Sequence, residues 1–261
     1  MDHLVWDINP IFWDAGIFQI HWYGLFFAAA FVTGFVVARF IFSRENISLH
    51  YLDSLLVYMM VGAVVGARLA HVIFYDPVYY LHHPLQIPAV WNGGLASHGG
   101  AIGIALALYV FCKRNPSIKY FWLLDRMTIP AVLGGFFIRV GNFFNSEILG
   151  LPSDKPWAII FSRVDSLSRH PTQLYEALTY LIIFSILFAL YIKRKPVRNG
   201  LFLGMFLSMV FFSRFLLEFT KVRQESFSNG VSLNVGQLLS IPAILVGLIL
   251  LYHYFRKKQT E

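Results

Sequence analysis

The chain has 261 residues, of which 57% are hydrophobic and 13% are charged, about half the charged share of an ordinary soluble domain. The apolar residues occur in uninterrupted runs that are long enough to cross a bilayer, and the mean hydropathy is +0.61, so an ordinary soluble globular fold is excluded. We attribute the formal net charge of +7 to membrane topology and expect no nucleic-acid partner, and the single Cys112 excludes an intrachain disulfide.

Seven apolar runs predict an all-α, polytopic integral membrane protein with about seven transmembrane helices. In chain order they cover residues 17–42, 53–74, 94–112, 122–145, 173–192, 200–219 and 235–255. Because each span uses about 20 residues, only short connections remain for structure outside the membrane. We therefore predict a single integral-membrane domain over residues 1–261.

The distribution of basic residues predicts the orientation of these spans. The connections after the first, third, fifth and seventh runs hold 12 Lys and Arg residues, whereas the opposite side holds 5. The side with more basic residues is cytoplasmic by the positive-inside rule, so we predict a cytoplasmic C-terminus and an N-terminus outside. Arg126 lies near a cytoplasmic helix end, where its long side chain can snorkel to the interface.

The densest polar group runs from Arg139 to Gly150, at the predicted outer end of the fourth span. On a helix with about 100° per residue, Arg139 and Asn142 share a face, and Glu147 can close over them. A charged side chain near the bilayer centre costs about 2.5–3.5 kcal/mol, so it needs a partner or a function. A guanidinium beside amide donors suits a phosphate, and a structural Arg139–Glu147 pair that joins two helices is the alternative.

Glycines are dense at the start of the third span, between residues 93 and 103. Each costs about 1 kcal/mol relative to alanine in a helix, which indicates that another group comes close to this backbone. Gly99 and Gly103 form a GxxxG pair, and Gly62 and Gly66 form another in the second span. Tight helix packing and the close approach of a ligand are both consistent with this pattern.

His98 follows Ser97 at the mouth of the third span. An imidazole there can accept a proton near neutral pH, so His98 is a candidate general base, with a hydrogen-bonded strut as the alternative. Ser97 and His98 point about 100° apart on one helix, and the sequence has no Gly-x-Ser-Gly segment. Both observations argue against an intramembrane serine protease.

The fifth span opens with residues 169–176, Arg-His-Pro-Thr-Gln-Leu-Tyr-Glu. Pro171 suits the first helical turn, where its missing N–H is not needed. Gln173 and Glu176 then project polar groups from that turn. The segment is either part of a polar site or a well-capped helix start.

Two further groups lie on the first and sixth spans. Arg214 and Glu218 are four residues apart and share a helix face, either as a structural pair or with Arg214 as a second cationic site for an anion. His-Trp-Tyr-Gly at residues 21–24 opens the first span, where an interfacial aromatic belt competes with a site.

Most of these groups converge on the predicted outer ends of the spans. A cationic, hydrogen-bonding pocket at the outer leaflet suits the head group of an anionic phospholipid. Secondary transporters also have glycine-interrupted helices and buried charges, but we find no inverted repeat in the sequence, so we favour an enzyme.

Five segments carry a resemblance to a known family over nearly the whole chain: 21–24, 93–100, 139–150, 170–176 and 214–219. In these segments and their order, the chain resembles the prolipoprotein diacylglyceryl transferases of the bacterial inner membrane. The resemblance implies transfer of the diacylglyceryl group of phosphatidylglycerol to the thiol of the lipobox cysteine of a prolipoprotein. This reaction forms a thioether and releases glycerol 1-phosphate.

The resemblance also implies the surroundings of the reaction. The chain is expected in the bacterial cell inner membrane, with its active site toward the outer leaflet and one catalytic domain over residues 1–261. The expected partners are phosphatidylglycerol, the signal peptide of a prolipoprotein with its lipobox cysteine, and membrane lipid. No cofactor and no metal are expected.

Positions that match the family's substrate-binding or catalytic residues are Tyr23, His98, Arg139, Asn142, Glu147, Gly150, Arg214 and Glu218. With neighbours from the same motifs, the predicted catalytic residues are His98, Tyr23, Arg139 and Arg214. The predicted substrate-binding residues are Arg139, Asn142, Asn145, Glu147, Gly150, His170, Gln173, Tyr175, Glu176 and Glu218.

Two features leave roles open. The general base is His98, His170 or no protein group. The chain departs from the family pattern at Ile138, where the family usually has glycine, and at Val210-Phe211, where the family has a Tyr-Gly pair. The second departure removes a hydroxyl group from that position.

Overall fold

The computed structural model describes residues 3–16, 18–90, 93–193, 198–222 and 233–257. The chain divides into two compact units. The terminal unit consists of Met1–Val37 and Asp125–Glu261, and the central unit is Ala38–Leu124. The expected single catalytic domain over residues 1–261 stays a prediction.

Six helices among the described residues are long and apolar enough to cross a membrane. They are α1 (Trp22–Arg44), α2 (Tyr51–Phe74), α5 (Tyr120–Phe144), α6 (Thr172–Lys193), α7 (Leu201–Leu217), continued by the 3-10 helix η3 (Glu218–Thr220), and α8 (Val235–Lys257). The seventh expected span is the 18-residue helix α4 (Ser97–Arg114), which is less apolar because both of its ends are polar. The chain is therefore a mostly helical, multi-pass membrane protein, close to the predicted architecture.

Large apolar side chains point outward along these helices. Val32 and Val36 on α1, Ile182 on α6 and Leu248 on α8 are each more than half exposed. A water-soluble protein rarely exposes so much contiguous apolar surface. In a bilayer these side chains contact lipid tails and not water, so the exposed faces fit a bilayer environment.

The terminal unit also contains two small sheets that the sequence did not predict. One has the order β1 (Leu4–Trp6), β4 (Ile159–Phe161) and β5 (Ser168–Arg169), with β1 parallel to β4 and β4 antiparallel to β5. The other is the antiparallel pair of β2 (Ile11–Asp14) and β3 (Gln19–His21), which leads into α1.

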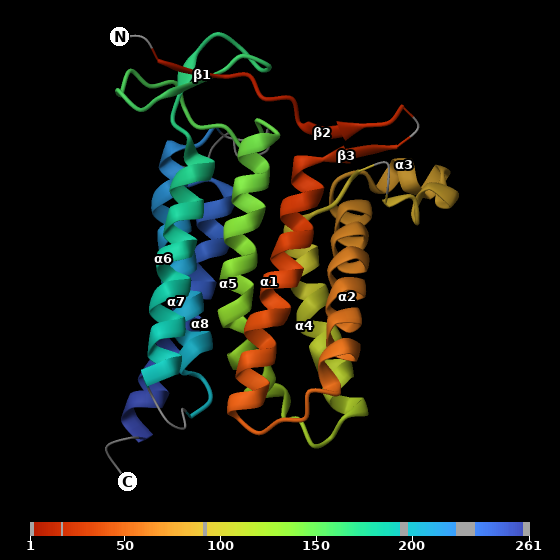
Figure 1. Ribbon diagram of the computed structural model, residues 1–261, viewed down its shortest axis with the longest axis vertical. Coiled ribbons are helices and arrows are strands. Elements are labelled where there is room, and N and C mark those ends of the chain that lie inside the picture. The colour runs from red at the N-terminus through yellow and green to blue at the C-terminus, as the bar shows by residue number, and fades with distance from the viewer. Residues whose placement is uncertain (1–2, 17, 91–92, 194–197, 223–232, 258–261) are drawn as a thin grey trace. The chain divides into compact units, whose positions relative to one another are not determined.

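Within the terminal unit, α6, α7 and α8 run side by side (Figure 1). Strand β1 lies beyond one end of these helices, and the last residues of α8 lie at the opposite end. Trp6 packs against Phe143 at the end of α5, with the ring centroids 4.2 Å apart. The sheet of β1, β4 and β5 therefore covers the same helix end that carries Arg139 and Asn142.

In the central unit, α2 and α4 are in contact through their glycines. A Cβ on Gly66 would lie 2.3 Å from the carbonyl oxygen of Gly99, and a Cβ on Gly103 would lie 2.0 Å from that of Gly62. Only glycine permits such an approach, so the predicted tight helix packing is confirmed. The group that comes close to the third span is the second span.

Arg68 on α2 holds the connection that leads from α3 (Pro77–His82) through η1 (Pro84–Gln86) toward α4. Its buried guanidinium donates hydrogen bonds to the carbonyl oxygens of Gln86 (2.6 Å), Ile87 (2.7 Å) and Gly93 (2.7 Å). These contacts compensate the burial of the charge, so Arg68 has a structural function here.

Arg126 differs from the expectation that it snorkels to the interface. Its side chain is 2% exposed and pairs with Asp125 at 2.6 Å. Asp125 Oδ1 in turn accepts hydrogen bonds from the backbone N–H groups of Gly200 (2.9 Å) and Leu203 (2.8 Å), and so caps the start of α7. Arg126 is buried because its partner is a buried carboxylate that is needed for this cap.

Candidate active site

Helix α5 presents Arg139 and Asn142 on one face, where Arg139 Nη1 donates to Asn142 Oδ1 at 3.2 Å. Behind the helix end, two left-handed residues, Ser146 (φ 56°) and Ile148 (φ 55°), reverse the chain. The reversal returns Glu147 to the helix, so that Asn142 Nδ2 donates to Glu147 Oε2 at 3.0 Å. Glu147 thus closes over the helix end, as its spacing from Arg139 predicts.

The first turn of α6 fixes this reversed segment. Buried Gln173 donates from Nε2 to the backbone oxygen of Glu147 at 2.5 Å, and Thr172 Oγ1 donates to that of Ile148 at 2.9 Å. Asn145 Nδ2 reaches Glu147 Oε1 at 3.1 Å. Gln173 and Asn145, both predicted to bind substrate, therefore shape the loop around Glu147 in this structure.

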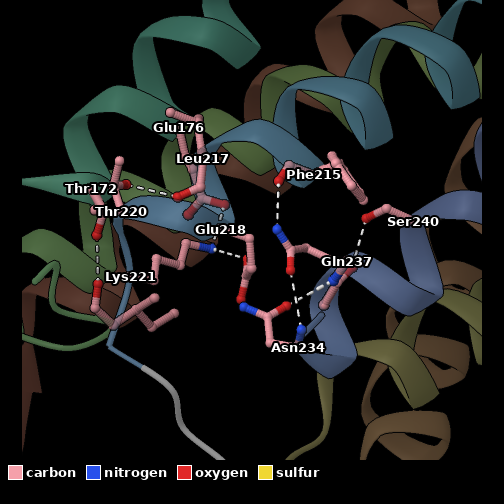
Figure 2. A network of polar contacts seen from close by, with 12 residues as sticks. Thr172, Glu176, Phe215, Leu217, Glu218, Thr220, Lys221, Asn234, Gln237 and Ser240 are labelled. Carbon is pink, nitrogen blue, oxygen red and sulfur yellow. Dashed lines mark hydrogen bonds and ion pairs between the residues drawn. The ribbon is translucent and has the colours of Figure 1, made fainter. Parts of the chain in front are cut away.

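Glu176 is fully buried on α6 and is shared by two cations. Arg139 Nε lies 3.1 Å from its Oε2, and Lys221 Nζ lies 2.9 Å from its Oε1. Lys221 Nζ also lies 3.0 Å from Glu218 Oε2, so two carboxylates share one ammonium group (Figure 2). Among the described residues, the acidic partner of Arg139 is Glu176, and the alternative pair with Glu147 is not formed.

Lys221 and Tyr180 are site residues that the sequence reasoning missed. Lys221 counted there only as a charge on the outer side, although its spacing of three residues from Glu218 is a signal for a pair. Tyr180 lies one helical turn after Glu176 and is close enough to Arg139 for electrostatic interaction. Both are buried beside the Arg139–Glu176 pair.

Arg214 on α7 interacts electrostatically with Glu176 and Tyr180. It makes no hydrogen bond or ion pair with any residue in the described parts of the chain. Its expected structural pair with Glu218 is not formed, because α7 ends at Leu217 and the Glu218 carboxylate turns to Lys221. Arg214 is therefore a second cation near the buried carboxylate.

Tyr23, in the first turn of α1, is half-buried and lies close enough to Arg139 and Glu147 for electrostatic interaction. Gly141 on α5 leaves room for it, since a Cβ on Gly141 would lie 2.9 Å from Tyr23 Cδ2. The predicted Tyr23 is therefore part of the Arg139 group. The two departures from the family pattern, Ile138 on α5 and buried Val210 on α7, are apolar helix residues.

A second polar group lies beside the first turn of α6. His170 Nδ1 is 3.1 Å from the hydroxyl of Tyr175, which accepts a hydrogen bond from Trp157 Nε1 at 2.7 Å. Tyr175 and Trp157 also line an apolar pocket of about 450 Å³. The other lining residues are Leu4, Pro156, Ala158, Ile159, Pro171 and Leu174.

Gly150 has a structural reason to be glycine. A Cβ at this position would lie 2.3 Å from the carbonyl oxygen of His170. The Gly150 carbonyl accepts a hydrogen bond from Arg169 at 3.2 Å, and Arg169 also pairs with Asp165. The hydrogen bond from Arg169 holds the pKa of the Asp165 carboxyl below its ordinary value.

Helix α8 begins against Glu218 (Figure 2). A Cβ on Gly236 would lie 2.8 Å from Glu218 Oε1, so the carboxylate sits directly on the first turn. Asn234 and Gln237 cap this turn reciprocally, with N–H to side-chain oxygen distances of 2.9 and 3.1 Å.

His98 lies in the central unit, in the first turn of α4, and its side chain is exposed. The other predicted site residues belong to the terminal unit. The role of His98 as a base stays a prediction. Within the described residues, no group of three or more His, Cys, Asp or Glu side chains could hold a metal ion.

The chemistry of the Arg139 group follows from its exposure and its partners. The Arg139 side chain is 12% exposed, whereas its partner Glu176 is fully buried. A guanidinium has five N–H donors, and the contacts of Arg139 use Nε for Glu176 and Nη1 for Asn142. The arrangement suits a phosphate group and the negative charge that develops when a phosphate ester leaves.

Comparison with known proteins finds similar chains over nearly the whole length. A family described as prolipoprotein diacylglyceryl transferase matches residues 10–253. A protein of Tolumonas auensis, named phosphatidylglycerol–prolipoprotein diacylglyceryl transferase, is 46% identical over 248 residues, which cover 95% of this chain and 96% of that protein. Proteins of the same name from Chloroherpeton thalassium and Porphyromonas gingivalis are 46% and 40% identical, each covering 99% of this chain and 97% of the relative.

Proposed function

The chain belongs to the prolipoprotein diacylglyceryl transferase family, and from this premise we propose that Arg139 and its neighbours form the site where it binds phosphatidylglycerol. The chain is a transferase that moves the diacylglyceryl group of phosphatidylglycerol to a prolipoprotein. The observation that carries the site assignment is the Arg139 side chain, which is 12% exposed and pairs with the fully buried Glu176.

The acceptor is the thiol of the lipobox cysteine. Its sulfur attacks the glyceryl carbon that is bonded to the phosphate oxygen, a C–S bond forms, and the C–O bond breaks. The bonding electrons leave with glycerol 1-phosphate, and the thiol proton passes to a base. Because a free thiol has a pKa near 8.5, only a few per cent is thiolate at pH 7, and a base raises that fraction.

We assign each residue of the site a role that follows from its charge. Arg139 binds the phosphate with Asn142 as a neutral donor, and Arg214 adds positive charge as the phosphate leaves. His98 is our first choice for the base, and His170 is the alternative because it belongs to a matching motif. Tyr23 and the loop around Glu147 lie beside Arg139.

We propose the same substrate-binding role for the remaining predicted residues. They are Asn145, Gly150, Gln173, Tyr175, Glu176 and Glu218. We place the protein in the bacterial cell inner membrane with the site toward the outer leaflet, where the signal peptide of a prolipoprotein presents its cysteine. The excess of 12 basic residues over 5 on the opposite side supports this orientation.

Mass spectrometry of a lipobox peptide tests the proposal. The peptide is incubated with purified protein and phosphatidylglycerol, and a peptide with serine in place of cysteine is the control. We expect a diacylglyceryl mass increment on the cysteine peptide alone. A transporter would leave both peptides unchanged, and that result contradicts the proposed activity.

A further inference from the structure

We propose that Lys221 is a positioning residue for this reaction: it shares Glu176 with Arg139 and so keeps the Arg139 guanidinium open to the phosphate of phosphatidylglycerol. The inference rests on the proposed function and extends it to a residue outside the predicted site. Lys221 touches Glu176 and Glu218, and it acts on the phosphate only through Arg139.

The ammonium group of Lys221 is buried between two carboxylates. Its side chain is 5% exposed, and its Nζ lies 2.9 Å from Glu176 Oε1 and 3.0 Å from Glu218 Oε2. Glu176 itself is 0% exposed, and its other oxygen faces Arg139 Nε at 3.1 Å. Each oxygen of the Glu176 carboxylate therefore faces a different cation.

The backbone around Lys221 fixes the place of this ammonium group. The N–H of Leu151 donates to Thr220 O at 2.8 Å, and the N–H of Val222 donates to Leu149 O at 3.1 Å. Lys221 and Gly150 thus form a short antiparallel bridge. The segment that follows Glu147 in the chain therefore holds the backbone of Lys221 in place, and the Lys221 side chain reaches Glu176 on α6 and Glu218 at the start of η3.

The effect on Arg139 follows from the geometry of carboxylate–guanidinium pairs. Without Lys221, Glu176 Oε1 would be buried without its ammonium partner. A bidentate pair with Arg139, in which both carboxylate oxygens contact the guanidinium, would then stabilise the carboxylate. Bidentate pairing engages a second nitrogen of the guanidinium and leaves fewer donors for phosphate. With Lys221 in place, Glu176 needs only Nε, and the rest of the fork stays available.

The charge balance acts in the same direction. Arg139, Lys221 and Arg214 carry three formal positive charges, and Glu147, Glu176 and Glu218 carry three formal negative charges, so the group as a whole is balanced. Removing the charge of Lys221 leaves a net negative charge, which repels an anion. The affinity of the site for an anionic lipid should therefore fall even where the fold is kept.

The test compares Lys221→Met with Lys221→Arg. Thermal stability in detergent, kcat, and the KM for phosphatidylglycerol and for the lipobox peptide are measured on each. We expect Lys221→Met to lower kcat/KM for phosphatidylglycerol by about 10–100-fold, partly through a higher KM, with the KM for the peptide unchanged. Lys221→Arg keeps the charge and should stay within about threefold of wild type. Lys155→Met, an exposed change of the same charge in the same unit, is the matched control.

Three results would overturn the inference. One is a folded Lys221→Met with wild-type kinetics, and another is a folded Lys221→Arg as impaired as Lys221→Met. The third is a loss of thermal stability with an unchanged KM for phosphatidylglycerol, because a purely structural role predicts it. If Lys221→Met does not fold, Lys221→Gln replaces it with the same expected shift. An inactive wild type contradicts the proposed function instead, so the two failures are distinguishable.

Discussion

Arg139 combines a charge with a planar fork, and the site uses both. Lysine keeps the charge but offers no bidentate geometry, whereas glutamine keeps planar donors without the charge. We predict that Arg139→Gln abolishes peptide lipidation and that Arg139→Lys impairs it severely, with both variants still inserted and folded. Lipidation of the peptide, expression level and thermal stability in detergent are measured together on each variant.

The partner of Arg139 supplies the control for this prediction. Because the guanidinium pairs with Glu176 and not with Glu147, the informative double variant is Arg139→Gln with Glu176→Gln. If Arg139 only compensates the charge of Glu176, the double variant regains both stability and lipidation. Our account predicts that lipidation stays lost, and a double variant that lipidates normally contradicts the phosphate-binding role.

The assignment of the base separates two histidines. His98→Gln keeps hydrogen bonding but cannot accept the thiol proton, so we predict a turnover lower by about 10²–10⁴-fold. His170→Gln, made in parallel, should lose only its contact with Tyr175. Near-normal turnover of His98→Gln with an inactive His170→Gln would identify His170 as the base. Normal turnover of both variants would indicate that substrate or water accepts the thiol proton.

At the level of single residues, the sequence predicted those contacts that follow from helix geometry. Arg139 and Asn142 are one turn apart, so their hydrogen bond could be expected from spacing alone. The contacts of Glu176 could not, because they join α6 to Arg139 on α5 and to Lys221 after η3, which are distant in the chain. Lys221 was missed for the same reason, since only the folded chain shows that it is buried.

Among the elements, the α2–α4 contact makes the clearest prediction. A larger side chain at Gly66 would meet the backbone of Gly99, which cannot yield as a flexible side chain would. We predict that Gly66→Leu destabilises the protein by about 1–3 kcal/mol or prevents its accumulation. Thermal unfolding in detergent measures this effect. Gly24→Ala, where a Cβ has no heavy atom within 4 Å, is the control and should be at least as stable as wild type, because alanine favours a helix more than glycine does. Equal stability of the two variants contradicts the packing.

The boundaries of the elements were largely predictable because long apolar runs can only be helices in lipid. The predicted spans 122–145 and 235–255 became α5 (Tyr120–Phe144) and α8 (Val235–Lys257). The short strands were not predictable, because three-residue segments such as β1 depend on a partner far along the chain. The predicted sixth span, 200–219, agrees with the apolar span Leu201–Thr220, although its last three residues form the 3-10 helix η3 and not a continuation of α7.

For the whole molecule, the basic residues predict that the site faces outward. In a background without Cys112, a cysteine at Ser153 should react with an impermeant thiol reagent added from outside. A cysteine at Lys195, which lies outside the described residues, should react only from the cytoplasmic side. The reverse labelling pattern would contradict the orientation and would separate the site from exported substrates.

Attack at the glyceryl carbon breaks the bond between that carbon and the phosphate oxygen, so the two products of the reaction identify the bond that breaks. Wild-type protein is incubated with a lipobox peptide and phosphatidylglycerol labelled in its head group, and lipidated peptide and free glycerol phosphate are quantified together. The account predicts equal amounts of the two products, with a diacylglyceryl increment on the cysteine. An acyl or phosphate-containing increment, or lipidated peptide without released glycerol phosphate, would contradict attack at the glyceryl carbon.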